Sequence, residues 1–129
     1  PLLMTLAERD DVLVYNLTKA MHLGYEDYAG ADPGSIGWHI DRQDFNWVVP
    51  FHAGAIRYFR EIGRWSDAED AHNAALLARQ EVLLTTWEEA RQLTSPESGV
   101  FQPGELPELW LRLRALRLRQ AGFDPVWEE

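Results

Sequence analysis

The chain has 129 residues, of which 46% are hydrophobic, which suffices for one domain with a sizeable core and argues against intrinsic disorder. The formal net charge of -9 disfavours a nucleic-acid partner, because phosphate binding requires a basic surface. The absence of cysteine excludes disulfides, thiolate metal ligands and cysteine nucleophiles, and no apolar run approaches the roughly 18 residues of a transmembrane helix.

The first seven residues, Pro1 to Ala7, are a short apolar run that is long enough for a buried strand and too short for a helix. A strand needs neighbours for its backbone hydrogen bonds, and the rest of the chain offers no second clear strand pattern. We therefore expect one short N-terminal strand whose sheet lies outside this chain.

Apolar residues at helical spacing predict an amphipathic helix over about 11–29, capped by Asp10 or Asp11. Residues 30–37 are rich in turn formers, and residues 38–49 are expected to form a short helix followed by an extended approach to Pro50. The residues that define the face of the first helix are Leu13, Leu17, Met21, Gly24 and Tyr28.

The stretch from Pro50 to Gly63 predicts a second helix, with proline at its start and glycine as its stop. Three small residues, Ala53 to Ala55, let another backbone or a ligand approach the first turn. Free amides and the helix dipole favour an anion there. His52 can add a donor or cap the turn. The residues alone leave open whether this turn packs against a neighbouring element or binds a ligand.

A capping box, Ser66-Asp-Ala-Glu69, begins a long helix that runs to about Leu93. Residues 96–107 are rich in proline and glycine and are expected to form a loop. A last helix is expected over about 107–121. Its predicted core face is Leu109, Leu113 and Leu116.

Candidate catalytic and metal-binding residues are few. Glu69 and His72 have the Glu-x-x-His spacing that places two ligands on one helix face, but a helical di-iron site needs two such motifs and two further glutamates. No nucleophile, base and oxyanion site come together, so we expect neither an enzyme nor a cofactor. Tyr15 and Lys19 lie four residues apart on one helix face; the lysine either contacts a ligand or lays its stem across the tyrosine, and the second interpretation is favoured.

Two segments resemble a known family. Residues 14–20, Val-Tyr-Asn-Leu-Thr-Lys-Ala, are similar to a vYxltKal helix, and residues 49–63 are similar to a vPxHpGAxrYyrExG signature. Both patterns are typical of the TAXI solute-binding proteins, the receptor subunits of TRAP transporters. Ala53 stands where that family usually has proline. The matching signature residues are Pro50, His52, Gly54, Ala55, Tyr58, Glu61 and Gly63.

The resemblance implies a fold that is mainly α with one short N-terminal strand, forming the C-terminal part of an α/β two-lobed, type II periplasmic-binding-protein fold. Residues 1–65 would belong to the solute-binding domain and residues 66–129 would be a helical C-terminal extension. Because the first lobe would be missing, along with a signal peptide, the isolated chain is expected to bind solute weakly or not at all.

The same resemblance implies a receptor outside the cytoplasm, either periplasmic or anchored to the outer side of the membrane. It would capture a small organic anion, an amino acid or a dicarboxylate, for TRAP membrane permease subunits, without chemistry of its own. The residues that it suggests for ligand binding are Tyr15, Lys19, His52, Gly54, Ala55, Arg57 and Tyr58.

A second interpretation does without a ligand. The apolar N-terminal strand or the helices of residues 66–129 would contact a partner or a second copy of the chain, making the protein a helical interaction or self-association module.

Overall fold

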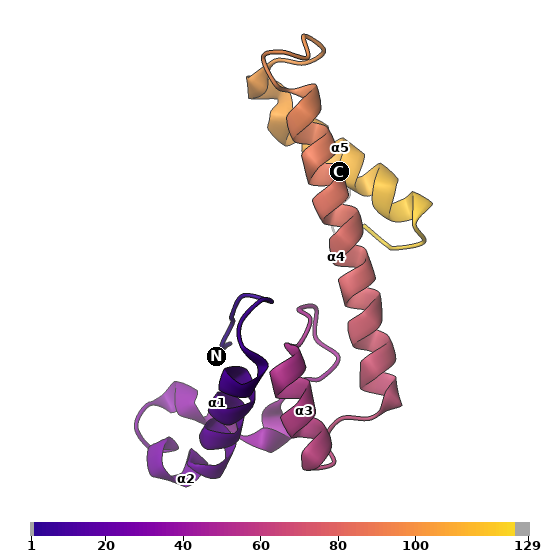
Figure 1. Cartoon of the computed structure of the whole chain (residues 1–129). Coiled ribbons are helices and arrows are strands. Elements are labelled where there is room, and N and C mark those ends of the chain that lie inside the picture. Colours follow the sequence, from indigo (N-terminus) through magenta and orange to yellow (C-terminus); the bar gives the residue numbers. More distant parts are fainter. Residues whose placement is uncertain (1, 126–129) are drawn as a thin grey trace. The chain divides into compact units, whose positions relative to one another are not determined.

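The computed structural model describes residues 2–125, which contribute to two compact units, Pro1–Ala74 (unit 1) and Ala75–Glu129 (unit 2). The residues outside the described range are Pro1 and 126–129. The helices, labelled in Figure 1, are α1 (Asp11–Leu23), α2 (Tyr25–Tyr28), α3 (Ala53–Glu61), α4 (Asp67–Leu93) and α5 (Leu106–Gln120). Short 3-10 turns are η1 (Pro33–Trp38), η2 (Ile40–Arg42) and η3 (Pro103–Glu105).

The predicted N-terminal strand is wrong. Residues 2–6 have no regular secondary structure, and the segment then turns, with the Arg9 amide donating to the Leu6 carbonyl at 3.2 Å. Between residues 2 and 125 there is no strand at all, so the described chain is helical rather than α/β. A strand is stable only beside another strand that completes its backbone hydrogen bonds, and the described chain supplies none. The apolar side chains of Leu2 to Leu6 are accordingly exposed.

The helix predicted over residues 11–29 is divided at Gly24. The Asp10 carboxylate caps its start, accepting from the Leu13 amide at 2.8 Å, as predicted. The buried residue of α1 is Val14, whereas Leu13 is 57% exposed and Leu17 is also exposed. Helical spacing therefore predicted this helix but misplaced its buried face at Leu13 and Leu17, whereas Met21 and Tyr28 of the predicted face are half-buried.

The short helix predicted within residues 38–49 is present only as the three-residue 3-10 turn η2, not as an α-helix. The extended approach expected before Pro50 is interrupted by turns and bends at residues 45–49, and no described helix lies between Arg42 and α3. The Asp32 carboxylate accepts from the Gly34 amide at 2.7 Å and so starts a 3-10 turn early. Such turns are tight and short, and they carry the chain back without the length of an α-helix.

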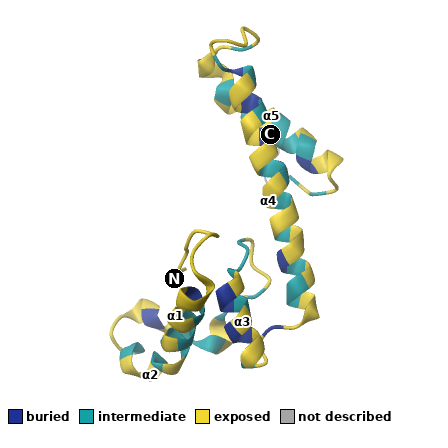
Figure 2. Cartoon of the chain, viewed as in Figure 1, coloured by how far each residue is buried: buried dark blue, intermediate teal, exposed yellow. Residues whose placement is uncertain are grey.

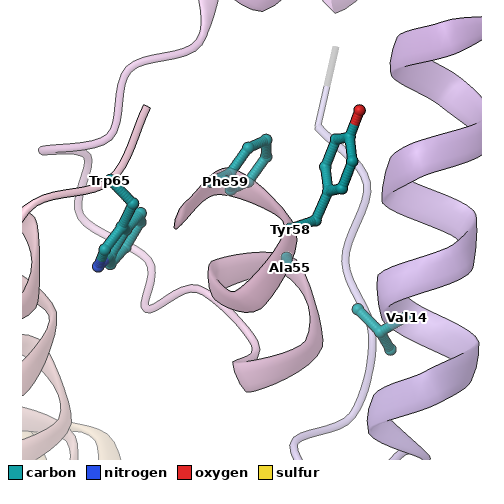
Figure 3. Close-up of a cluster of buried hydrophobic side chains, with 5 residues drawn as sticks. All are labelled: Val14, Ala55, Tyr58, Phe59 and Trp65. Atoms are coloured by element: carbon teal, nitrogen blue, oxygen red, sulfur yellow. The ribbon is translucent and has the colours of Figure 1, made fainter. Parts of the chain in front are cut away.

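The core of unit 1 lies between α1, α3 and the segment that follows α3. Figure 3 shows the Tyr58 ring beside α1, with the Phe59 and Trp65 rings further from that helix. Two half-buried rings, Phe45 and Phe51, complete this group: Phe45 meets Phe59 edge-on at 4.9 Å between centroids. Edge-to-face contacts of this kind add to the area that the rings bury. The core residues are Val14, Ala55, Tyr58, Phe59 and Trp65.

The predicted starts and stops near α3 and α4 agree closely with the structure. Gly63 has φ +71°, the left-handed conformation that ends a helix at low cost for glycine. At the start of α4, the Glu69 carboxylate accepts from the Ser66 amide at 2.8 Å, as the capping box predicts. The Ser66 hydroxyl accepts from the Ala68 amide at 3.3 Å rather than from that of Glu69.

In unit 2, α4 and α5 make contact through large side chains. The Trp87 and Trp110 rings meet edge-on at 5.3 Å, and Arg117 makes two hydrogen bonds to the Glu89 carboxylate. The predicted core face of α5 is right at Leu109, which is buried, and wrong at Leu116, which is exposed. Much of the surface of α4 is exposed (Figure 2). None of the described helices has the length and apolar character that crossing a bilayer requires.

Candidate functional site

Gly54 allows α3 to approach the backbone of α1. A Cβ atom built on Gly54 would overlap the Asp11 carbonyl oxygen and would lie 2.9 Å from the Tyr15 amide nitrogen and 3.0 Å from the Val14 Cβ. Only glycine leaves room for this contact. The small first turn of α3 is therefore packed against α1, and Ala55 beside it is buried as well.

His52 ties the start of α3 to the segment before α1. Its Nδ1 accepts from the Gly54 amide at 3.1 Å, and its Nε2 lies 3.1 Å from the Arg9 carbonyl oxygen. A carbonyl can only accept, so both bonds form when the neutral ring carries its proton on Nε2. The side chain is only 9% exposed. Both of these hydrogen bonds therefore go to the backbone of the chain itself.

Replacing His52 with alanine is expected to destabilise unit 1 by about 1 kcal/mol, because the Gly54 amide loses its cap. Asparagine is the matched variant, since its side chain can accept from the same amide but cannot reach the Arg9 carbonyl in the same way. We expect His52→Asn to recover most of the loss in denaturant unfolding. Equal losses in both variants would show that the cap contributes little.

Four polar side chains come together on the surface where α1 faces α3. We call Tyr15, Lys19, Arg57 and Glu61 the α1–α3 polar cluster. The Tyr15 hydroxyl donates to Glu61 Oε2, and Lys19 Nζ lies 3.2 Å from Glu61 Oε1 and 3.2 Å from the Tyr15 hydroxyl oxygen. The Arg57 guanidinium lies over the Tyr15 ring at 4.3 Å from its centroid, a cation–π contact.

Tyr58 forms the floor under this cluster. Its side chain is 1% exposed, and its ring meets the Tyr15 ring edge-on at 5.7 Å between centroids. Its hydroxyl lies 2.6 Å from His22 Nδ1. Burial raises the pKa of the Tyr58 hydroxyl, which keeps the group neutral. Tyr58 therefore supports the cluster from the core.

Charges within the cluster stabilise one another. The hydrogen bond from Tyr15, followed by that from Lys19, lowers the pKa of the Glu61 carboxyl below its ordinary value of 4.5. Hydrogen bonds to Tyr15 and then to Glu61 raise the pKa of Lys19 above 10.5. Both groups are consequently charged across the neutral range.

The lowered pKa of Glu61 predicts a pH dependence. A carboxyl whose pKa is lower in the folded state stabilises that state above its unfolded value, near 4.5, and the stabilisation is lost as pH falls through the folded pKa. Glu61→Gln should therefore lose less stability than the wild type between pH 7 and about pH 3. Denaturant midpoints at several pH values test this. Glu69 and Asp70, whose pKa values are also lowered, contribute the same pH dependence to both proteins, so any difference between the two profiles belongs to Glu61. Parallel profiles would contradict the prediction.

The residues predicted to bind ligand occupy three environments. Tyr15, Lys19 and Arg57 meet in the polar cluster at the surface. Gly54 and Ala55 are buried under α1, and Tyr58 lies in the core. The His52 ring contacts the backbone of Arg9 and Gly54, and its Nδ1 lies 3.8 Å from Asp11 Oδ1. That any of them binds a ligand stays a prediction.

The sequence did not predict that Glu61 belongs to this cluster. Glu61 was matched within the signature of residues 49–63, but it was not among the predicted site residues. It lies one turn after Arg57, and this spacing was a usable signal that the two share a helix face. Its contact with Tyr15 depends on the packing of α1 against α3, which no local pattern shows.

Glu69 and His72 make separate contacts. The Glu69 carboxylate holds Ser66, and His72 Nε2 lies 2.9 Å from the Trp47 carbonyl oxygen. Across residues 2–125, no group of three or more histidines and carboxylates is arranged to hold a metal ion.

Comparison with known proteins points to a class of binding protein. Residues 1–63, just under half of the 129, match the model of the NMT1-like family. This family consists of periplasmic binding proteins and includes TRAP-type solute receptors. Its members are binding proteins rather than enzymes and are generally extracytoplasmic. No curated protein and no solved structure matches the chain. The segment that contains α1, α3 and the polar cluster is thus similar to periplasmic solute-binding proteins.

Proposed function

We propose that residues 1–65 belong to a TAXI-type solute receptor of a TRAP transporter and that residues 66–129 are a helical extension of it. The receptor captures a small organic anion, an amino acid or a dicarboxylate, outside the cytoplasm and passes it to the membrane permease subunits. The observation that carries this proposal is the family match over residues 1–63, which includes the whole polar cluster.

The polar cluster suits the recognition of a carboxylate. Lys19 and Arg57 supply two cations, and the Tyr15 hydroxyl, which accepts from Lys19 and donates to Glu61, supplies a further donor. Arginine can hold a carboxylate through two parallel hydrogen bonds, and stacking on an aromatic ring leaves its edge available for this. The net charge of the chain is -9, so attraction of an anion must come from local groups such as these.

Calorimetric titration with L-glutamate and 2-oxoglutarate tests this function. We expect the wild type to bind at least one of them weakly, in the millimolar range, and Arg57→Met to bind it several-fold more weakly. Arg42→Met is the control, because Arg42 is an exposed arginine of the same unit outside the cluster. Equal affinities of Arg57→Met and Arg42→Met would contradict the proposal.

A second candidate function is self-association through α4. Leu77 and Leu84 are both more than half exposed and lie seven residues apart, which places them on one face of the helix. Trp87, one turn beyond Leu84, is exposed too. Light scattering distinguishes this function: a concentration-dependent dimer that Leu84→Glu abolishes would support it, and a strict monomer would exclude it.

A further inference from the structure

The donors of the polar cluster already hold a carboxylate, and it comes from the chain itself. Glu61 receives one hydrogen bond on each oxygen, from the Tyr15 hydroxyl on Oε2 and from Lys19 Nζ on Oε1. Charge-assisted bonds of this kind are also how a protein holds the carboxylate of a small ligand. We propose that Glu61 is an internal occupant of a carboxylate-binding site formed by Tyr15, Lys19 and Arg57, and that a solute carboxylate must compete with it.

The position of Glu61 in its helix supports this assignment. Glu61 is the last residue of α3, where the helix dipole favours a cation over a carboxylate. Its place there is therefore not explained by the stability of α3. The favourable partners of Glu61 are Lys19 and Tyr15 on α1 and Arg57 on its own helix, whose charge also lowers the Glu61 pKa.

Glu61 can leave the site without disturbing the core. Its side chain is 49% exposed and that of Lys19 is 38% exposed, so water and small solutes reach the contact between them. The buried floor under the site is the Tyr58 ring, which belongs to the core and does not depend on Glu61 for its packing. Rotation of Glu61 into solvent would leave its three partners in place for another anion.

The charges of the cluster show what the site would take. Lys19 and Arg57 carry two positive charges and Glu61 carries one negative charge, so one positive charge remains when Glu61 is bound. Displacement of Glu61 uncovers both cations. A monocarboxylate therefore replaces Glu61 one for one, and a dicarboxylate can neutralise the site fully. This inference names the competitor within the site of the proposed function, and it rests on that function where it concerns the natural solute.

Chemical rescue tests the internal carboxylate directly. In Glu61→Ala the donors remain and their carboxylate is missing, so sodium formate and sodium acetate are the probes. We expect both to raise the thermal midpoint of Glu61→Ala saturably, and to raise that of the wild type much less. Sodium chloride at the same ionic strength controls for screening. Equal effects of acetate and chloride on Glu61→Ala, or equal effects of acetate on both proteins, would overturn the proposal.

Two further variants test whether acetate acts at the α1–α3 polar cluster. Lys19→Met/Glu61→Ala removes a donor together with the carboxylate, and the saturable effect of acetate should disappear in it. Glu61→Gln keeps the size of the side chain and serves if the alanine variant does not fold. In this variant, acetate should shift the amide resonances of residues 15–19 and 57–61. Shifts elsewhere only, or none, would contradict the inference.

Affinity for a solute separates this inference from the proposed function. If Glu61 competes, Glu61→Gln should bind L-glutamate with an apparent dissociation constant about five- to tenfold lower than the wild type. Glu8→Gln, an exposed residue of unit 1 outside the cluster, controls for the change of charge. Equal binding to the wild type and Glu61→Gln would overturn the competition and leave the proposed function standing. Acetate rescue together with equal affinities of Arg57→Met and Arg42→Met for L-glutamate would support the internal carboxylate and contradict the proposed function.

Discussion

Gly54→Ala is expected to destabilise unit 1 by about 2 kcal/mol or more. The added methyl group would overlap the Asp11 carbonyl oxygen and crowd the Tyr15 amide, and these are backbone atoms that cannot rotate away. Overpacking typically costs about 1–3 kcal/mol, and a clash with backbone lies at the upper end of that range. The better helix propensity of alanine returns at most about 1 kcal/mol, so the clash decides the sign.

Gly30→Ala is the matched control for this change. Gly30 lies in the same unit, its φ is not in the left-handed region, and no heavy atom lies within 4 Å of a Cβ built on it. We expect its effect to stay within about 0.5 kcal/mol. Hydrogen exchange of the amides of α1 and α3 measures both variants. Equal protection in Gly54→Ala and Gly30→Ala would mean that α3 does not approach α1 through this glycine.

Tyr58→Ala is expected to cost about 3–5 kcal/mol, the usual range for removing a buried aromatic side chain. The ring is almost completely buried and lies against Tyr15, His22 and Phe59. The loss is a large part of the 5–15 kcal/mol that stabilises a typical domain. Because Tyr58 supports Tyr15 from below, the polar cluster should lose its arrangement together with the core.

Tyr58→Phe separates the ring from its hydroxyl. It retains the ring and removes only the contact with His22, for which we expect a loss of about 1 kcal/mol. Leu13→Ala controls for a large apolar side chain of the same unit that is exposed, with an expected change of about 0.5 kcal/mol. A loss for Tyr58→Ala no larger than that for Leu13→Ala, measured by denaturant unfolding, would contradict the described core.

Local sequence signals predicted the helices where their ends carry a specific chemistry. The Asp10 cap, the glutamate of the capping box at Glu69 and the glycine stop at Gly63 all act within a few residues, so the sequence alone contains the interaction. Which face of a helix is buried depends on which other element packs against it. Val14 rather than Leu13 is buried because α3 packs on that side, and helical spacing cannot show where a neighbour lies.

The prediction of an N-terminal strand failed for a related reason, because a strand forms only by pairing with another strand and not from local sequence alone. An apolar run of Leu2 to Leu6 satisfies the composition of a strand, but the pairing that makes one is absent from the described chain. The turns expected over residues 30–37 are present, since the Asp32 carboxylate starts η1 there. The helix expected within residues 38–49 is only the 3-10 turn η2, whose start His39 caps by accepting from the Asp41 amide.

The candidate site could be predicted only in part. Tyr15 and Lys19 share a helix face by their spacing, and the structure confirms the contact between their side chains. Their meeting with Arg57 and Glu61 depends on the close approach of two helices at Gly54, which lies between distant parts of the chain. Family resemblance supplied Arg57, and it supplied no role for Glu61.

The most direct test of the account is to locate a carboxylate solute on the whole chain by NMR. We predict that L-glutamate shifts the backbone amides of residues 15–22 and 52–61 in a saturable way, and that Lys19→Met weakens the effect. Shifts confined to other residues, or a response that Lys19→Met leaves unchanged, would contradict the claim that the surface between α1 and α3 binds an organic anion.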